Sequence, residues 1–131
     1  ATKYLLDRAG VDCIWVTGTG GGGPHAWNIV KCDGQYYYVD TTWGDPGYRE
    51  LQGEDVTKDF VAYEYLCCSG QMLNQTHTPD TTYPLPECTD TSLEYYRMKG
   101  RYLETADAGM TLDIMKQAYN DGKKYTKIRY L

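Results

Sequence analysis

Residues 25–43 read HAWNIVKCDGQYYYVDTTW, and this stretch decides the fold. Two runs rich in strand-forming residues, 26–32 and 35–42, lie on either side of the dipeptide Asp33-Gly34. An Asp-Gly pair between such runs is a preferred two-residue turn of a β-hairpin, because both residues tolerate a positive φ. The sequence therefore predicts an antiparallel hairpin.

The length of this turn sets the register of the hairpin. With two turn residues, Trp27 lies opposite Asp40, and His25 is the diagonal neighbour of Asp40. Alternation then puts all three side chains on one face, where a diagonal separation of roughly 7 Å lets an imidazole and a carboxylate meet. A turn one residue longer would place His25 and Asp40 on opposite faces. The register thus predicts contact between them.

A His beside an Asp has two interpretations. The pair can be a structural hydrogen bond, which is the more common case for two residues on one hairpin face. It can also be a general base with the carboxylate that orients it, as in a nucleophile–base–orienter triad. The role of Trp27 also has two interpretations: it can be a core residue, or it can shield the His–Asp pair from water.

Local patterns predict five further elements. Residues 1–9 fit the end of a helix that stops at Gly10, and residues 111–120 carry apolar side chains at helical spacing. Further strands are expected at 13–16, 60–67 and 125–131. Together these elements predict an α+β fold, with a mostly antiparallel sheet and flanking helices, in a single domain over residues 1–131.

Two segments are expected to be irregular. The glycine-rich residues 20–24 should form a flexible loop beside His25, and residues 74–90, rich in Thr, Pro and Asp, should cross the surface. His77 is interpreted as an exposed residue rather than a metal ligand, since no other ligand has suitable spacing. Residues 18–23 also match the glycine pattern of dinucleotide-binding sites, but Pro24 and a strand follow where that pattern requires a helix.

Composition narrows the classes of partner. The formal net charge is −5, with 18 acidic against 13 basic residues. This balance argues against sequence-independent nucleic-acid binding, which needs clustered Lys and Arg. No run approaches the ~18 consecutive apolar residues of a membrane span. We therefore expect neither nucleic acid nor a bilayer to be the partner.

The five cysteines do not predict a metal site or a disulfide framework, because they form no CxxC pair and no even set. They stand at positions 13, 32, 67, 68 and 88. None is expected to act as a nucleophile: Cys13 lies in a strand expected to be buried, and Cys32 lies at the far end of the hairpin, about 23 Å from His25 along an extended strand. No metal and no cofactor are predicted.

The hairpin block resembles the His-to-Asp block of the transglutaminase-like superfamily, whose members have a papain-type cysteine acyl-transfer fold. The residues that carry the resemblance are 25–30, 33–34, 36–40 and 42–46, preceded by 4–10 and 13–17. On this basis residues 1–47 are the His/Asp core block. Residues 48–131 look like the C-terminal extension of bacterial, often surface-associated members.

The resemblance implies a Cys-His-Asp triad that acts on protein or peptide amide bonds. His25 would be the general base and acid, Asp40 its orienting partner, and Trp27 and Asn28 would shield the site or contact substrate. The family's cysteine opens the helix that precedes this block, so it is expected upstream of Ala1, and the fold is expected to lack its N-terminal part. The chain alone should then be inactive. Proteolysis, deamidation and cross-linking remain open, as does a non-catalytic peptide- or glycan-binding module. An extracellular or cell-surface location is implied.

Overall fold

The computed structural model describes residues 1–45 and 61–130. The chain divides into two compact units, Ala1–Tyr95 and Tyr96–Leu131, and each is described by itself. The expected boundary after residue 47 and the first residue of the strand expected at 60–67 lie outside the described residues.

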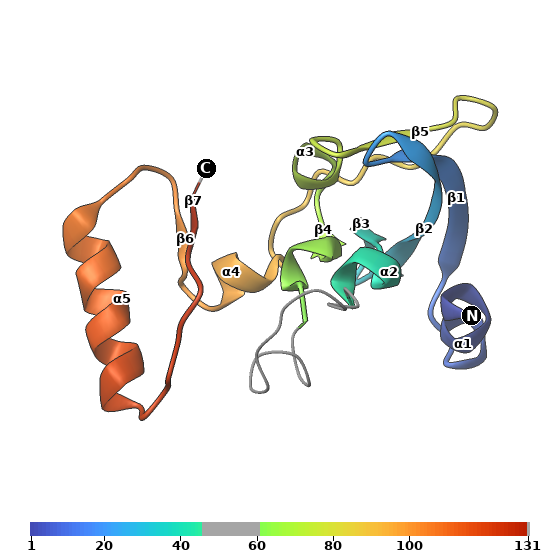
Figure 1. The fold of residues 1–131 in the computed structure, drawn as a ribbon. Helices are drawn as coiled ribbons and strands as arrows, with labels where there is room; N and C mark the ends of the chain where they lie inside the picture. Colours follow the sequence, from blue (N-terminus) through green and yellow to red (C-terminus); the bar gives the residue numbers. More distant parts are fainter. Residues whose placement is uncertain (46–60, 131) are drawn as a thin grey trace, which may run out of the picture. The chain divides into compact units, whose positions relative to one another are not determined.

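The first unit is α+β and is built on a five-stranded antiparallel sheet with the order β4-β3-β2-β1-β5 (Figure 1). Its strands are β1 (Cys13–Gly20), β2 (Gly23–Cys32), β3 (Gln35–Val39), β4 (Leu66–Cys68) and β5 (His77–Pro79). Its helices are α1 (Thr2–Arg8), α2 (Thr41–Gly44), η1 (Tyr63–Tyr65) and α3 (Gly70–Leu73). The expected mostly antiparallel sheet is confirmed.

The β2–β3 hairpin has the predicted register. Asp33 and Gly34 are the two turn residues and both have positive φ, 50° and 82°. The pairing runs from Cys32 opposite Gln35 to Asn28 opposite Val39. The local preference of Asp-Gly for this turn therefore fixes the hairpin, as the sequence predicts.

The prediction of a flexible loop at residues 20–24 is wrong. β1 continues to Gly20 and β2 begins at Gly23, so only Gly21 and Gly22 form the turn of a second tight hairpin. Both turn residues have positive φ, 59° and 86°, which glycine adopts without a steric penalty. The glycines that suggested flexibility instead let the chain reverse in two residues.

Two more predictions between residues 60 and 90 need correction. The expected strand over 60–67 forms only at Leu66–Cys68, because residues 63–65 make a 3₁₀ turn before it. The irregular segment expected at 74–90 contains β5, which pairs with the far end of β1 through Gly18 opposite Pro79. A strand this short is fixed by its partner rather than by its own pattern.

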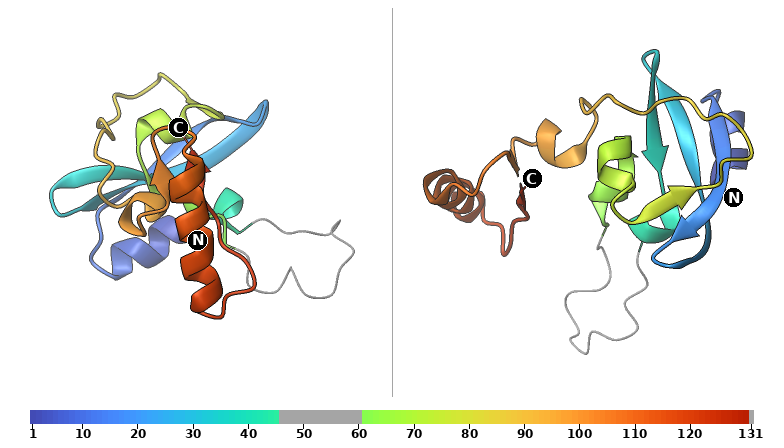
Figure 2. Two further views of the ribbon diagram at one scale, coloured as in Figure 1. Left: turned by 90° about the vertical axis from the view of Figure 1, so that its left-hand side faces the viewer. Right: turned by 90° about the horizontal axis from the view of Figure 1, so that it is seen from above.

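The sheet buries a cluster of apolar side chains on each face. α3 lies on one side of the sheet and α1 on the other (Figure 2). The cluster under α3 consists of Val16, Trp27, Ile29, Tyr38, Cys68, Leu73 and Cys88. The cluster on the opposite face consists of Cys13, Val30, Tyr37 and Val39, with Leu6 of α1 packed against it. The expected N-terminal helix is thus confirmed, and Gly10 follows it with a φ of 79°.

The second unit contains α5 (Ala108–Asn120), β6 (Tyr102–Leu103) and β7 (Arg129–Tyr130), and α4 (Tyr95–Met98) lies where the two units divide. α5 confirms the helix expected at 111–120 and begins one turn earlier, at the cap formed by Asp107. β7 pairs in parallel with β6 and is shorter than the strand expected at 125–131. In the described part of the chain, no helix has the length and apolar character that a bilayer span requires.

Candidate functional site

His25 and Asp40 are in contact. The Nε2 atom of His25 lies 2.6 Å from Oδ2 of Asp40. His25 comes from β2 and Asp40 follows β3 directly, so the hairpin register brings them together as the sequence predicts. The imidazole is 16% exposed and the carboxylate 1%. The pair therefore has a buried carboxylate and a ring that solvent can reach.

Asp40 is held rigidly because it also caps a helix. The predicted strand ends at Val39 rather than at residue 42, since the side chain of Asp40 acts as the N-cap of α2. Its Oδ1 atom accepts hydrogen bonds from the backbone N–H groups of Thr42 and Trp43 at 2.9 and 3.0 Å. Its own backbone N–H donates to the carbonyl of Tyr65. One carboxylate oxygen is thus committed to the backbone, and the other faces His25.

His77 is the site residue that sequence reasoning missed. It was interpreted as exposed, but it is only 2% exposed, and its Nε2 atom lies 3.0 Å from the same Asp40 Oδ2 atom. Its Nδ1 atom lies 2.8 Å from the hydroxyl of Thr76. The error has a physical cause: β5 pairs with β1, Gly20 opposite His77, and nothing in the local sequence of residues 74–90 indicates that pairing. The one available signal is that the chain has only two histidines.

Aromatic rings enclose the two imidazoles. Trp27 stacks on His25 with ring centroids 5.9 Å apart, and Trp43 lies 6.0 Å from the same ring. His77 meets Trp43 at 4.6 Å, Trp27 at 5.0 Å and Tyr65 at 6.2 Å. The rings help to bury His77 and Asp40, and hydrogen bonds shielded from water in this way are stronger, whereas His25 stays partly exposed. Trp27 is buried in the core as well as stacked on His25, and among the described residues its buried Nε1 atom has no hydrogen-bond partner.

The glycines of β1 allow the close approach of strands around His25. A Cβ atom at Gly20 would lie 2.8 Å from Cδ2 of His25. A Cβ atom at Gly18 would lie 2.2 Å from the carbonyl oxygen of Thr78. Both distances are shorter than a real Cβ contact, so a side chain at either position would force its neighbour to shift. The segment expected to be a flexible loop instead places Gly20 directly against the imidazole.

Asn28, expected beside the site, lies elsewhere. Its neighbour Trp27 faces His77, and alternation along β2 turns Asn28 to the opposite face of the sheet. There its amide is buried and donates to the carbonyl of Ile14 at 3.3 Å. The structure therefore groups His25, Trp27 and Asp40 with His77, and leaves Asn28 in a structural hydrogen bond.

None of the five cysteines, all in the described residues, is paired in a disulfide. Three of them have hydrogen bonds to backbone carbonyls: Cys13, Cys68 and Cys88. Burial raises the pKa of the Cys68 thiol to about 12 and that of the Cys88 thiol to about 11. Thiols held in the neutral form are poor nucleophiles.

The two imidazoles and the carboxylate are also a possible ligand set for a metal ion. One atom from each of His25, Asp40 and His77 lies within 4.8 Å of the others, and such nitrogen and oxygen donors suit zinc. The same atoms already satisfy one another at 2.6 and 3.0 Å. A metal would therefore have to replace two hydrogen bonds.

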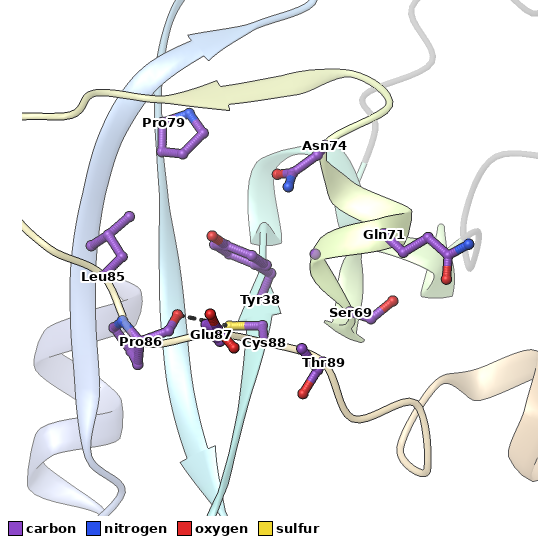
Figure 3. A pocket seen from close by; sticks show the side chains of 11 residues that line it. Tyr38, Ser69, Gln71, Asn74, Pro79, Leu85, Pro86, Glu87, Cys88 and Thr89 are labelled. Carbon is purple, nitrogen blue, oxygen red and sulfur yellow. Dashed lines mark hydrogen bonds between the residues drawn. The ribbon is translucent and has the colours of Figure 1, made fainter.

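A hollow of about 530 Å³ opens on the face of the sheet that α3 covers. Figure 3 shows the Tyr38 ring among side chains of α3 and of the 85–89 segment. Burial, followed by the neighbouring Cys88 and Cys68, raises the pKa of Tyr38, so its hydroxyl remains a hydrogen-bond donor. The lining consists of Tyr38, Ser69, Gly70, Gln71, Asn74, Pro79, Leu85, Pro86, Glu87, Cys88 and Thr89.

No family model matches the chain. A search of curated proteins likewise finds no match. The interpretation of the site therefore depends on its geometry and on the sequence motif.

Proposed function

We propose that this chain carries the His–Asp part of a transglutaminase-like cysteine acyl-transfer domain, in which His25 is the general base. The observation that carries the proposal is the 2.6 Å bond between Nε2 of His25 and Asp40. It leaves Nδ1 of His25 without a hydrogen-bond partner among the described residues, on a ring that is partly exposed. A general base needs such a nitrogen. The α+β fold with its antiparallel sheet is compatible with this family.

The roles of the two residues follow from their chemistry. A carboxylate accepts hydrogen bonds and does not donate them, so Nε2 of His25 carries the proton and Nδ1 has a free lone pair. Nδ1 takes the proton of a thiol, the thiolate attacks an amide carbonyl, and a carbon–sulfur bond forms. Nδ1–H then protonates the leaving amine as the carbon–nitrogen bond breaks. Water or a second amine finally attacks the thioester and gives its proton to Nδ1, and the carbon–sulfur bond breaks as the thiol is regenerated. Asp40 fixes the tautomer and stabilises the imidazolium.

The thiolate would come from residues outside this chain. Cys68 and Cys88 have raised pKa values, and no hydrogen bond links any cysteine to His25 among the described residues. The proposal also includes a protein or peptide substrate and an extracellular or cell-surface location. Two backbone amides hold Asp40 rigidly, and this favours catalysis because a fixed carboxylate keeps the His25 base correctly oriented.

The test is amide turnover by the natural gene product that contains this chain, measured as ammonia release from glutamine peptides, peptide cleavage and incorporation of a primary amine. We expect His25→Ala to abolish turnover and Asp40→Asn to reduce kcat by about 10⁴-fold, as in other triads. Asp113→Asn, at an exposed position on α5, is the matched control. The 131-residue chain alone should give the buffer rate. Full activity of His25→Ala, or robust turnover by the chain alone, would contradict the proposal.

The hollow beside Tyr38 favours a second candidate, a non-catalytic module that binds peptide or glycan. An aromatic ring with nearby amide and carboxylate groups, as Tyr38, Asn74 and Glu87 provide, suits either ligand. The test is titration of the chain with cell-wall glycan fragments and with short peptides. Binding that Tyr38→Ala removes, together with an inactive gene product, would favour this module over the enzyme.

A further inference from the structure

His77 is too deeply buried to take part in catalysis by direct contact with a substrate. Its side chain is 0% exposed, so no substrate can touch it. Burying an imidazole costs free energy unless its nitrogens find partners. Here both do: Nε2 meets Asp40 Oδ2 at 3.0 Å and Nδ1 meets the Thr76 hydroxyl at 2.8 Å. Any role in chemistry must therefore act through Asp40.

The four hydrogen bonds to Asp40 divide evenly between its two oxygens. Oδ1 accepts two backbone N–H groups, from Thr42 and Trp43, and Oδ2 lies next to the Nε2 atoms of His25 and His77. A carboxylate oxygen has two lone pairs, so each imidazole takes one of those on Oδ2. With all four positions filled, the carboxylate cannot rotate about its Cβ–Cγ bond without breaking several bonds. His25 can then reach Oδ2 of Asp40 from one direction only.

The tautomer of His77 follows from the same partners. Asp40 can only accept, so Nε2 of His77 carries a proton. Nδ1 can then accept from Thr76, whose hydroxyl lies 2.8 Å from it and 3.3 Å from the carbonyl of Leu73. The shorter contact favours donation to Nδ1. His77 thus points a fixed N–H group at Asp40.

We propose that His77 is a positioning residue, which fixes the Asp40 carboxylate and through it holds the His25 ring with Nδ1 free. The three side chains form a His–Asp–His array rather than a pair. The catalytic consequence depends on the function proposed above. The positioning of Asp40 and His25 by His77 does not depend on that function, because it follows from the folded structure of this chain.

The direct test uses the fact that the chain has only two histidines. With ¹⁵N-labelled histidine, each imidazole N–H that is bonded to Asp40 should give a low-field proton signal protected from exchange with water. We expect two such signals in the wild-type chain. His77→Leu should remove one and make the remaining His25 proton exchange at least tenfold faster. His77→Gln should preserve the His25 signal, because its amide can donate from nearly the position of Nε2.

A His25 proton unchanged in folded His77→Leu would overturn the proposal, since it would leave His77 with a packing role only. If that variant does not fold, Thr76→Val provides the test. It keeps both imidazoles but removes the partner of His77 Nδ1, and should speed exchange of both protons. Thr78→Val, at an exposed position on β5 next to His77, is its matched control and should leave both signals unchanged. Unchanged signals in Thr76→Val would also overturn the proposal.

Activity of the natural gene product separates this inference from the proposed function. We expect His77→Leu to lower kcat by about 10- to 100-fold with a smaller change in KM, and His77→Gln to restore most of it. An inactive wild-type protein with the expected proton signals would refute acyl transfer and leave the positioning intact. An active wild type that His77→Leu does not impair would refute the contribution of this positioning to turnover.

Discussion

At the scale of single residues, the site depends on one carboxylate. Asp40 accepts from two backbone amides and contacts two imidazoles, and only 1% of its side chain is exposed. A buried carboxylate that loses a partner keeps its desolvation cost, so substitutions around Asp40 should affect both stability and geometry. The glycines next to the site also matter at this scale, because adding a single methyl group at one of them would disturb the site.

The first prediction concerns Gly20. A methyl group there would meet Cδ2 of His25 at 2.8 Å and push the adjacent Nε2 atom away from Asp40. We expect Gly20→Ala to destabilise the chain by about 1–3 kcal/mol and to weaken the protected His25 proton signal. Thermal unfolding and the same NMR spectrum measure both effects.

Gly23→Ala is the control for that substitution, because a Cβ atom at Gly23 meets nothing within 4 Å. It should leave stability and the His25 signal close to wild type. Equal effects of the two substitutions would show that the loss comes from glycine's backbone freedom rather than from contact with His25.

The second prediction concerns thiol reactivity. A thiol with a pKa of about 12, as for Cys68, has a thiolate fraction of roughly 10⁻⁴ at pH 8. Cys88, whose pKa is raised to about 11, should also be slow. We expect Cys32, which is only partly buried, to react with a disulfide reagent before Cys68 and Cys88, which should react only on unfolding. Mass spectrometry of partly modified chain identifies the sites; early labelling of Cys68 would contradict this order.

At the scale of elements, hairpins and strand pairing place the side chains. The β2–β3 hairpin alone brings His25 to Asp40, whereas His77 arrives on β5, a strand of three residues that pairs with the far end of β1. A further long-range link joins β3 to the segment after Cys88: the hydroxyl of Tyr37 donates to Asp90 at 2.6 Å.

The third prediction uses that link. Hydrogen bonds from Ser92 and then from Tyr37 lower the pKa of Asp90. A carboxyl group whose pKa is lower in the folded state contributes stability above its unfolded pKa, and this contribution is lost as the pH falls through the folded value. Tyr37→Phe should therefore lower the unfolding midpoint at pH 7, and the difference from wild type should shrink below about pH 4. Chemical unfolding as a function of pH measures it, and a difference that does not vary with pH would contradict it.

At the scale of the whole molecule, the candidate site belongs to one compact unit. Both apolar clusters lie within Ala1–Tyr95, as do the hydrogen bonds that His25, Asp40 and His77 make to described residues. The hollow beside Tyr38 also lies within this unit. The site therefore needs no described residue of the second unit.

The fourth prediction follows from that division. A chain of residues 1–98, which keeps α4 whole, should unfold cooperatively and retain both protected histidine protons. Circular dichroism during heating and the NMR spectrum of labelled histidine test it. A non-cooperative transition or the loss of both signals would show that residues 99–131 are required for the site.

The sequence by itself determined what local backbone rules control. The positive φ preference of Asp33-Gly34 set the hairpin, and alternation put His25, Trp27 and Asp40 together. Gly10 marked the end of α1, and the spacing of apolar residues located α5. The tertiary structure decided the rest. Residues 74–90 have no strong pattern of their own, so only pairing with β1 creates β5 and buries His77. Local conformational preferences depend on neighbouring residues and can be predicted from them, whereas pairing between distant strands depends on the free energy of the complete sheet.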